Sequence, residues 1–343
     1  YDPALNRESG AGQIGQGSKV ASVSRIRDEF LDQRITEQLS LHSTYNARFQ
    51  FLKQVEQIFN EPGSPTLKEK FDDFIQSWND LASNPEESSA RQALVTSSQN
   101  MLGNVKDHYE NLMRLRGHVD SMIRDKVSEV NSLAKQIKDL NVEIVKVKAM
   151  GDQPNDLLDK RDAFIDQLAK LVDVKVVKTD PDETMVYVGD RPLVQGIQLS
   201  PIQVLNNPDN DGMATLAWES GELVKLKNGE IKGLIQVRDE DILNAMKKLN
   251  HFVTNLAESV NEIHNSGFGL NPQTGLNFFS ARSITGEVNG NYDANKDGQF
   301  DSTHIFKVSG TQKLTGNEAI GEEGVMNLGP DSSGKDVLIR YQA

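Results

Sequence analysis

The feature that most constrains the fold is a long stretch without proline, Glu86 to Ala149, in which apolar residues recur mostly at steps of three and four. This spacing is close to the heptad of a coiled coil. A continuous helix of this length would extend about 90 Å at about 1.5 Å per residue, although Gly103 and Gly117 each weaken it by about 1 kcal/mol relative to alanine. Such a helix needs partner helices to bury its apolar residues. These residues are Leu94, Met101, Val105, Leu112, Leu115, Val119, Met122, Val127, Val130, Leu133, Ile137, Leu140, Ile144 and Val147.

Four further stretches have helical periodicity and can supply those partners. The first two end at a proline that follows them, because proline cannot continue a helix. The third follows a Gly-containing break after the long stretch, which predicts a helical hairpin. The four stretches are Ser22 to Phe59, Ser64 to Asn84, Asp156 to Val172 and Asp239 to Ser266.

Beyond residue 172 the apolar period changes to two, which is typical of strands. Short runs that begin at Val174, Thr184 and Ala214 are separated by Gly, Pro, Asn and Asp, and they predict a small antiparallel β-insert near residues 174–232. After residue 267 the chain is rich in glycine and asparagine. Strand-like runs then appear at Ser283–Ile284, His304–Val308 and Val337–Arg340.

These patterns predict an α+β protein with two domains. We expect an elongated, rod-like and coiled-coil-like bundle of long helices with the small antiparallel β-insert in residues 1–281, and a mainly β outer domain in residues 282–343. The outer domain has too few strand-like runs to close a sandwich or barrel, so we expect it to be truncated. Two domains fit 343 residues, because single cores stop growing at roughly 250–300 residues.

Composition argues against several classes of function. A formal net charge of -13 would repel a phosphate backbone, so we expect no nucleic-acid partner. The chain has no cysteine, which rules out a disulfide framework, a thiolate metal site and a cysteine nucleophile. No run approaches the roughly 20 apolar residues that cross a bilayer, so we expect no membrane insertion.

The sequence contains no motif that supports catalysis. Gly10 to Gly15 matches the letters of a dinucleotide fingerprint, but no strand precedes it and no helix opens on it, so a glycine-rich loop within an extended lead-in is the simpler interpretation. The six histidines show no metal-ligand spacing. We therefore predict that the protein is not an enzyme, with no catalytic residues and no required cofactor.

The charged run Asp156 to Asp162 also has a structural interpretation. On a helix, Asp159, Lys160 and Asp162 would lie mainly away from the apolar side chains of the same segment. A solvated face with local ion pairs is therefore expected, and not a catalytic cluster.

One loop does have the pattern of a metal site. The segment DANKDGQFD, residues 293–301, places oxygen ligands as in a calcium loop, with Gly298 at the sharp turn. Position twelve is His304, where an EF-hand has glutamate, and the flanks are not paired helices. Two interpretations stay open, a calcium loop and an ordinary Asp/Asn/Gly turn. The candidate ligands are Asp293, Asn295, Asp297, the main-chain carbonyl of Gln299, and Asp301.

Several segments in order resemble the hook-associated protein 1 family of the bacterial flagellum. The most specific is FIQSWNDLASNPE, residues 74–86, which continues to ARQALV at 90–95. The others are IRDEFLD at 26–32, LLDKRD at 157–162 with LVDV at 171–174, and NEIH at 261–264 leading through Gly267 and Gly275 to Phe278-Phe279. The resemblance covers roughly residues 1–281, and residues after 281 match less well.

The resemblance implies a structural protein of the flagellar axis, secreted through the type III export apparatus, that joins the hook to the filament and is needed for filament assembly and motility. The implied partners are the hook protein, the second hook-filament junction protein, copies of the same protein and an export chaperone. The resemblance also implies that the chain is a core segment, which terminal helices that drive assembly would flank at both ends. Two alternatives come from other classes: a calcium-binding extracellular interaction or adhesion module, and an enzyme of unknown class.

Overall fold

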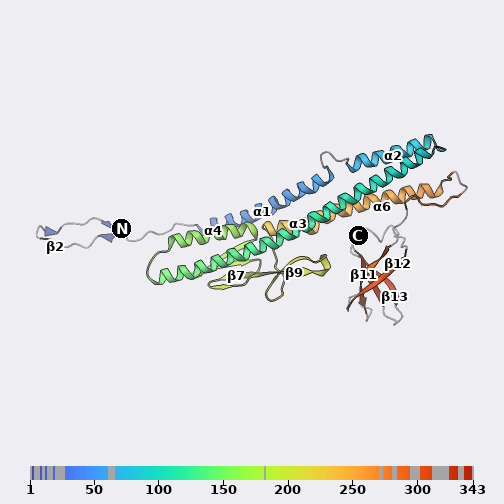
Figure 1. Cartoon of the computed structure of the whole chain (residues 1–343). Helices are drawn as coiled ribbons and strands as arrows, with labels where there is room; N and C mark the ends of the chain where they lie inside the picture. The colour runs from blue at the N-terminus through green and yellow to red at the C-terminus, as the bar shows by residue number, and fades with distance from the viewer. Residues whose placement is uncertain are drawn as a thin grey trace. The chain divides into compact units, whose positions relative to one another are not determined.

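The computed structural model describes most of the chain (Figure 1). The chain divides into two units. The first unit contains residues 1–56 and 113–241, and the second contains residues 57–112 and 242–343. The described residues are 28–60, 66–180, 183–269 and 273–279, together with the strands β1 Asp2–Pro3, β2 Glu8–Ser9, β3 Gly12–Gln13, β4 Ser18–Lys19, β11 Ile284–Asp293, β12 Ser302–Gly310, β13 Gly324–Pro330 and β14 Asp336–Tyr341.

The predicted long helix forms as one element, α3, Ser88–Ala149. Its two glycines do not interrupt it, and close packing does not require them, since a Cβ atom at Gly103 or Gly117 would meet no heavy atom within 4 Å. Within the first unit its buried face follows most of the predicted series, but Ile123 is fully buried where Met122 was expected, and Leu140 and Val147 are only half-buried. The buried apolar residues on this part of α3 are Leu115, Val119, Ile123, Val127, Val130, Leu133, Ala134, Ile137 and Ile144.

The helix α1, Glu29–Phe59, packs through a face that is largely polar or small. Ser40 and Thr44 are buried, and the hydroxyl of Thr44 accepts a hydrogen bond from the main-chain N–H of Gly229 at 2.7 Å. Gly229 precedes α5, Glu230–Gln236, and Gly233 of α5 lies so close to α1 that a Cβ there would be 2.5 Å from the carbonyl oxygen of Thr44. Small residues on both helices thus permit close contact.

The β-insert lies between α4, Asn155–Leu171, and α5. One antiparallel sheet has the order β5 Val174–Asp180, β6 Glu183–Val188, β7 Arg191–Gln195 and β8 Gln198–Leu199, while β9 Ile202–Asn207 pairs with β10 Met213–Trp218 as a separate hairpin. The three predicted strands form. The prediction missed β7, the two-residue β8 and β9. Pro192 inside β7 and Pro201 before β9 made these segments look like turns.

The prediction for the last long helix was wrong at its start. Helix begins at Glu230 and not at Asp239: α5 continues through a π-helical turn, Val237–Asp241, into α6, Ile242–Ser266. The positive φ of 106° at Gly229 sets this start. The two glycines in and before α5 hid the apolar spacing of Ile231, Leu234 and Val237, which are fully buried.

The second unit is centred on an aromatic cluster. Its buried members are Phe74 of α2, Leu67–Ser83, and two residues from the first part of α3. Thr66 begins α2 with a capping box, in which its hydroxyl accepts a bond from the N–H of Glu69 and the Glu69 carboxylate accepts one from the N–H of Thr66. The cluster consists of Phe74, Leu94 and Met101, with Phe71, Trp78, Leu81, Leu256, Val260, Phe278 and Phe279 packed against them.

The strands after residue 284 form one antiparallel sheet of order β12-β11-β14-β13. β12 and β14 contain the predicted runs His304–Val308 and Val337–Arg340, and β11 begins at Ile284, the second residue of the run Ser283–Ile284. β13 was not predicted. The predicted domain boundary near Ala281 lies outside the described residues and stays a prediction. The α+β class, with long helices and a small antiparallel insert, is confirmed.

Candidate functional site: polar contacts between α3 and the β-insert

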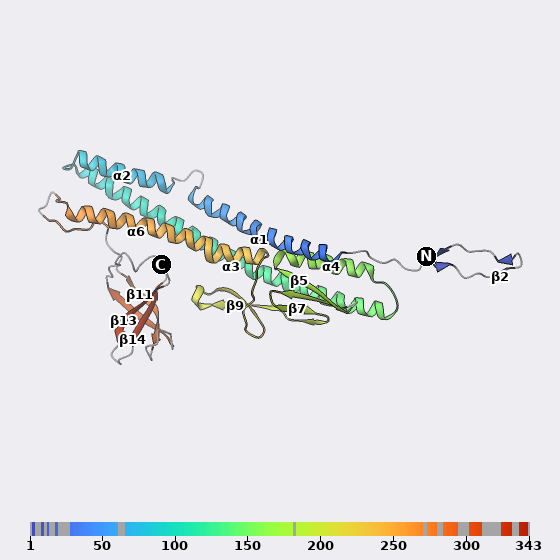
Figure 2. The same ribbon diagram turned by 180° about the vertical axis from the view of Figure 1, so that it is seen from behind.

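Three polar residues on one helix fix the β-insert in place. Asp120, Asn131 and Asn141 are spaced by about three helical turns, so they lie along one stripe of α3. Each bonds to the main chain of a different part of the insert. Figures 1 and 2 both show β7 and β9 beside this part of α3.

Asn131, in the middle of the stripe, pairs with the main chain at the start of β9. Its amide nitrogen donates to the carbonyl oxygen of Ile202 at 2.8 Å, and its amide oxygen accepts from the N–H of Ile202 at 2.9 Å. The side chain satisfies both main-chain groups of one strand residue, as a neighbouring strand would. This contact places the hairpin β9–β10 on α3.

Asn141 is buried and holds the first sheet of the insert. Its amide nitrogen donates to the carbonyl oxygens of Thr184 at 3.3 Å and Gly196 at 2.9 Å. Its amide oxygen accepts from Arg161 of α4 at 3.1 Å. One side chain therefore links α3, α4, β6 and the turn between β7 and β8.

Arg161 belongs to the charged run, for which the sequence predicted a solvated face. Asp159 and Lys160 are exposed, as expected, but Asp162 is only half-buried and Arg161 is buried. The prediction overlooked that a guanidinium can reach inward to an amide on the neighbouring helix.

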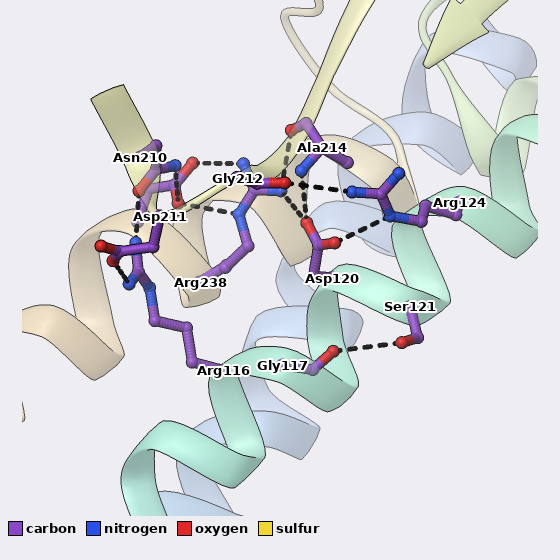
Figure 3. A network of polar contacts seen from close by, with 11 residues as sticks. Arg116, Gly117, Asp120, Ser121, Arg124, Asn210, Asp211, Gly212, Ala214 and Arg238 are labelled. Atoms are coloured by element: carbon purple, nitrogen blue, oxygen red, sulfur yellow. Dashed lines mark hydrogen bonds and ion pairs between the residues drawn. The ribbon is translucent and has the colours of Figure 1, made fainter. Parts of the chain in front are cut away.

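Asp120 is the centre of a denser network at the end of the β9–β10 hairpin (Figure 3). Its carboxylate accepts from the N–H of Ala214 at 2.7 Å, from Arg238 at 2.6 Å and from Arg124 at 2.9 Å. Arg238, in the π-helical turn, also donates to the carbonyl oxygen of Ala214 at 2.8 Å. The side chains of both Asp120 and Arg238 are almost fully buried.

A second carboxylate completes the pairing of Arg238. Asp239 accepts from the Nε and Nη2 atoms of Arg238 at 2.8 and 2.7 Å, and from the amide of Asn210 at 3.0 Å. Arg116 of α3 donates to Asn210 and to Asp211 in the same loop. Asp211 has a φ of 52°, a left-handed conformation that aspartate tolerates better than most residues.

The network controls the charge state of its members. Burial by itself would raise the pKa of Asp120, but the hydrogen bonds from Ala214, Arg124 and Arg238 outweigh burial and hold its pKa below the ordinary value of 3.8. Burial opposes the charge of Arg238 as well, and the bonds to Asp239 and Asp120 nevertheless raise its pKa. Both groups therefore stay ionised at neutral pH.

We expect stability to depend on acid through Asp120. An aspartate whose folded pKa is depressed contributes stability that is present above the unfolded pKa and is lost as pH falls through the folded pKa. Asp120→Asn should lower the free energy of unfolding by at least about 1.5 kcal/mol at pH 7, and this difference should shrink below about pH 4. Urea denaturation at several pH values measures it.

The control for this prediction is Asp190→Asn, because the Asp190 carboxylate is largely exposed beside Lys225. Its effect should stay within about 1 kcal/mol at every pH. A difference for Asp120→Asn that is unchanged down to pH 3 would show that ionisation of Asp120 is not what stabilises the fold.

The candidate calcium ligands lie almost entirely outside the described residues. Asp293 is the last residue of β11, and the structure does not describe Asn295, Asp297, Gln299 or Asp301. Among the residues that are described, no group of three or more His, Asp or Glu side chains could hold a metal ion. Within that same part of the chain, no helix is long and apolar enough to cross a membrane.

Sequence analysis did not identify Asp120, Asn131, Asn141 or Arg238. The signal for Asn141 is its spacing: it lies four residues after Ile137 and three before Ile144, which is the spacing of a core position, although the predicted series placed Leu140 there. No such signal exists for Asp120 and Arg238, which are 118 residues apart.

The contacts of the second unit explain one of the resemblance motifs. Asn261 of α6 accepts from the N–H of Phe279 at 2.8 Å and donates to its carbonyl oxygen at 2.9 Å, and the ring nitrogen Nδ1 of His264 lies 2.6 Å from the carbonyl oxygen of Leu276. These bonds hold Phe278 and Phe279 against the ring of Phe74. The motif residues are structural.

The fold is a helical scaffold: long helices hold a β-insert through buried polar side chains. Each site residue described above makes a structural contact. The family described as "Flagellar hook-associated protein FlgK helical domain" matches residues 52–279, more than half of the chain. The chain therefore belongs to the FlgK family of flagellar hook-associated proteins.

Individual relatives agree with this assignment. The chain is 28% identical over 279 residues to "Flagellar hook-associated protein 1" of Escherichia coli (strain K12). This alignment covers 78% of the chain and 51% of the relative. It is 35% identical over 178 residues to the protein of the same name from Bacillus subtilis (strain 168), covering 51% of the chain and 35% of the relative. The chain thus spans at most about half the length of these curated relatives.

The fold also matches a solved structure. The flagellar hook junction protein FlgK from Burkholderia pseudomallei is similar with a TM-score of 0.64 and 23% sequence identity, over 78% of this chain and 49% of that one. At this identity the match shows a shared fold.

Proposed function

We propose that this chain is the scaffold of a structural axial protein that joins the flagellar hook to the filament. The observation that carries the proposal is the family match over residues 52–279, and the relatives named hook-associated protein 1 support it. On this proposal the protein is secreted through flagellar export. Its partners are the hook protein, the second hook-filament junction protein, copies of itself and an export chaperone.

The geometry suits a protein that transmits load. The β-insert is fixed to α3 at three separated points, Asp120, Asn131 and Asn141, and to the π-helical turn through Arg238. A force on the insert is therefore shared by several hydrogen bonds and one buried ion pair, and is passed into the long helix. Asp120 and Asp239, the paired carboxylates of the network, are engaged with arginine, so their arrangement favours mechanical coupling over catalysis.

The test is deletion of the gene and complementation with the full-length protein. We expect cells with hooks but without filaments, and unpolymerised flagellin in the medium. Electron microscopy and an immunoblot for flagellin measure both. Normal filaments in the deletion strain would contradict the proposal, as would failure of the full-length gene to restore them.

A second proposal concerns the loop at residues 293–301, where calcium would bind through the predicted ligands. A ligand that binds only the folded state at a hundred times its Kd adds about 2.7 kcal/mol of stability. We therefore expect saturating CaCl₂ to raise the melting midpoint of the chain, and the double variant Asp293→Asn and Asp297→Asn to abolish this rise.

Asp190→Asn and Mg²⁺ are the controls for the calcium test, since neither should reproduce the effect. If calcium leaves the midpoint unchanged, the segment is an ordinary turn, and the alternative of a calcium-dependent interaction module loses its basis. The proposed junction role does not depend on this result.

A further inference from the structure

The segment that leads into α5 contains an Asn-Gly pair, Asn228–Gly229, which is one of two such pairs in the sequence. Asparagine followed by glycine is the dipeptide most prone to spontaneous deamidation, because glycine has no Cβ atom to hinder attack by its own main-chain nitrogen. The reaction needs water and no enzyme or cofactor. The pair is therefore a candidate site of covalent self-modification.

The reaction at such a pair has two steps. The main-chain nitrogen of Gly229 loses its proton and bonds to Cγ of Asn228, while the bond from Cγ to Nδ2 breaks and the side-chain nitrogen takes up a proton and leaves as ammonia. Water then opens the cyclic imide. Addition of water at Cγ gives aspartate. Addition at the main-chain carbonyl carbon of residue 228 gives isoaspartate, in which the main chain runs through the former side chain.

In the folded chain the attacking nitrogen is engaged with α1. The N–H of Gly229 donates to the hydroxyl of Thr44 at 2.7 Å and to the carbonyl oxygen of Ser40 at 3.1 Å, and Gly229 is buried. The Thr44 hydroxyl also donates to the carbonyl oxygen of Gly229 at 3.1 Å. Both bonds of the N–H must break before this nitrogen can lose its proton, so the folded structure opposes the first step.

The residue that would be attacked is fixed as well. The carboxylate of Asp173, which follows α4, accepts from the N–H of Lys227 at 3.0 Å and from the N–H of Asn228. The main chain is therefore tied to Asp173 on one side of the Asn228–Gly229 peptide bond and to α1 on the other. These two anchors limit the rotation about the main-chain bonds of Asn228 by which Cγ would approach the nitrogen of Gly229.

The isoaspartyl product does not fit between the same two anchors. It lengthens the main chain between them by one methylene group, at a place without spare room: even a Cβ atom on Gly229 would lie 2.5 Å from the carbonyl oxygen of Leu171. The new carboxylate would also lie beside Asp173, and burial already raises the pKa of that carboxyl. A chain with isoaspartate at position 228 therefore cannot place Gly229 against α1 and α4 as observed.

We propose that Asn228 is a self-modification site that reacts only while the first unit is unfolded, and that isoaspartate at this position prevents the unit from folding again. Its protection in the folded chain comes from Thr44 and Ser40. The site thus limits the time that the chain can spend unfolded and still reach its structure. The inference rests on these contacts and not on the proposed flagellar function.

The first test compares deamidation of the folded and the denatured chain. Peptide mapping by mass spectrometry follows both Asn-Gly pairs in mildly alkaline buffer, with and without guanidinium chloride. We expect Asn228 to react at least about tenfold more slowly in the folded chain, because the reaction waits for local opening. In denaturant it should react as fast as the other pair, Asn289–Gly290, which is the internal reference. Equal rates at Asn228 with and without denaturant would overturn the proposal.

A variant of α1 tests which contact protects the site. Thr44→Val removes the hydroxyl that accepts from Gly229, and it should speed the reaction at Asn228 in the folded chain about fivefold, the effect of one lost hydrogen bond. Asp120→Asn is the matched control, because it weakens the same unit through contacts that do not involve Gly229. Urea denaturation measures the stability of both variants. If the rate at Asn228 follows stability alone in the two variants, Thr44 does not protect the site.

Refolding tests the second half of the proposal. The chain is held in denaturant until Asn228 has reacted, then refolded and separated by size-exclusion chromatography. Isoaspartate at position 228 should be concentrated in the fraction that fails to fold. Asn228→Gln is the control, since its longer side chain closes the ring much more slowly, and it should refold after the same treatment. Isoaspartate at position 228 in the folded fraction, in the same proportion as in the whole sample, would contradict this half.

Discussion

Replacing Arg238 with alanine is expected to lower the free energy of unfolding of the first unit by about 3–5 kcal/mol. Removing one partner of a buried ion pair costs this much because the other partner keeps its charge without compensation. Here Asp120 is about 10% exposed and would lose its 2.6 Å contact, keeping only Arg124 and the N–H of Ala214 as partners. The carbonyl oxygen of Ala214 would lose a donor. Asp239 is partly exposed, so water would hydrate its carboxylate once Arg238 is removed.

The two tryptophans of the chain make the measurement specific. Trp218 is buried in β10 of the first unit, and Trp78 lies in the aromatic cluster of the second. In a Trp78→Phe background, fluorescence during urea denaturation reports on the first unit alone. Arg238→Ala should shift this transition to lower urea.

Arg191→Ala is the matched control for Arg238→Ala. Arg191 also pairs with a carboxylate, Glu222, but both side chains are at least 40% exposed. Exposed pairs of this kind contribute at most about 1 kcal/mol. If Arg238→Ala costs no more than Arg191→Ala, the buried network is not what fixes the β-insert to the helix.

The fold was predictable where local periodicity decides it. The steps of three and four in α3 and the alternation in β6 and β10 are imposed by burial of one face, and they are visible without any partner. The start of α5 was not predictable from the sequence. Gly229 lies in close contact with the end of α4 and Gly233 with α1, and glycines weaken the sequence pattern that indicates a helix. Tertiary packing overrides propensity at these positions.

The site was less predictable than the fold, for a reason of sequence distance. Asn131 and Asn141 are polar residues along a helix with one buried apolar stripe, but their partners are main-chain groups, which every residue has. Asp120 and Arg238 look like ordinary surface charges until the chain brings them together. The resemblance motif around Asn261 was recognisable as a pattern, and only the contacts to Phe279 explain why those residues occur there.

Gly229→Ala is the second change for which we expect a large loss, about 3–5 kcal/mol in the free energy of unfolding of the first unit. Two costs combine at this position. The φ of 106° is one that residues with a Cβ atom rarely adopt. In addition, a Cβ atom would lie 2.5 Å from both the carbonyl oxygen of Leu171 and the Cα atom of Val172, which is a clash with main chain that cannot rotate away.

Gly151→Ala separates these two costs. Gly151, between α3 and α4, has a similar φ of 89°, but a Cβ atom there would meet nothing within 4 Å. It should therefore lose only the conformational term, about 1–2 kcal/mol. The Trp218 assay compares the two variants directly. An equal loss for both would mean that the main chain at Leu171 and Val172 can move away from residue 229 without cost. A larger loss for Gly229→Ala would establish that close contact between Gly229 and the end of α4 requires a glycine.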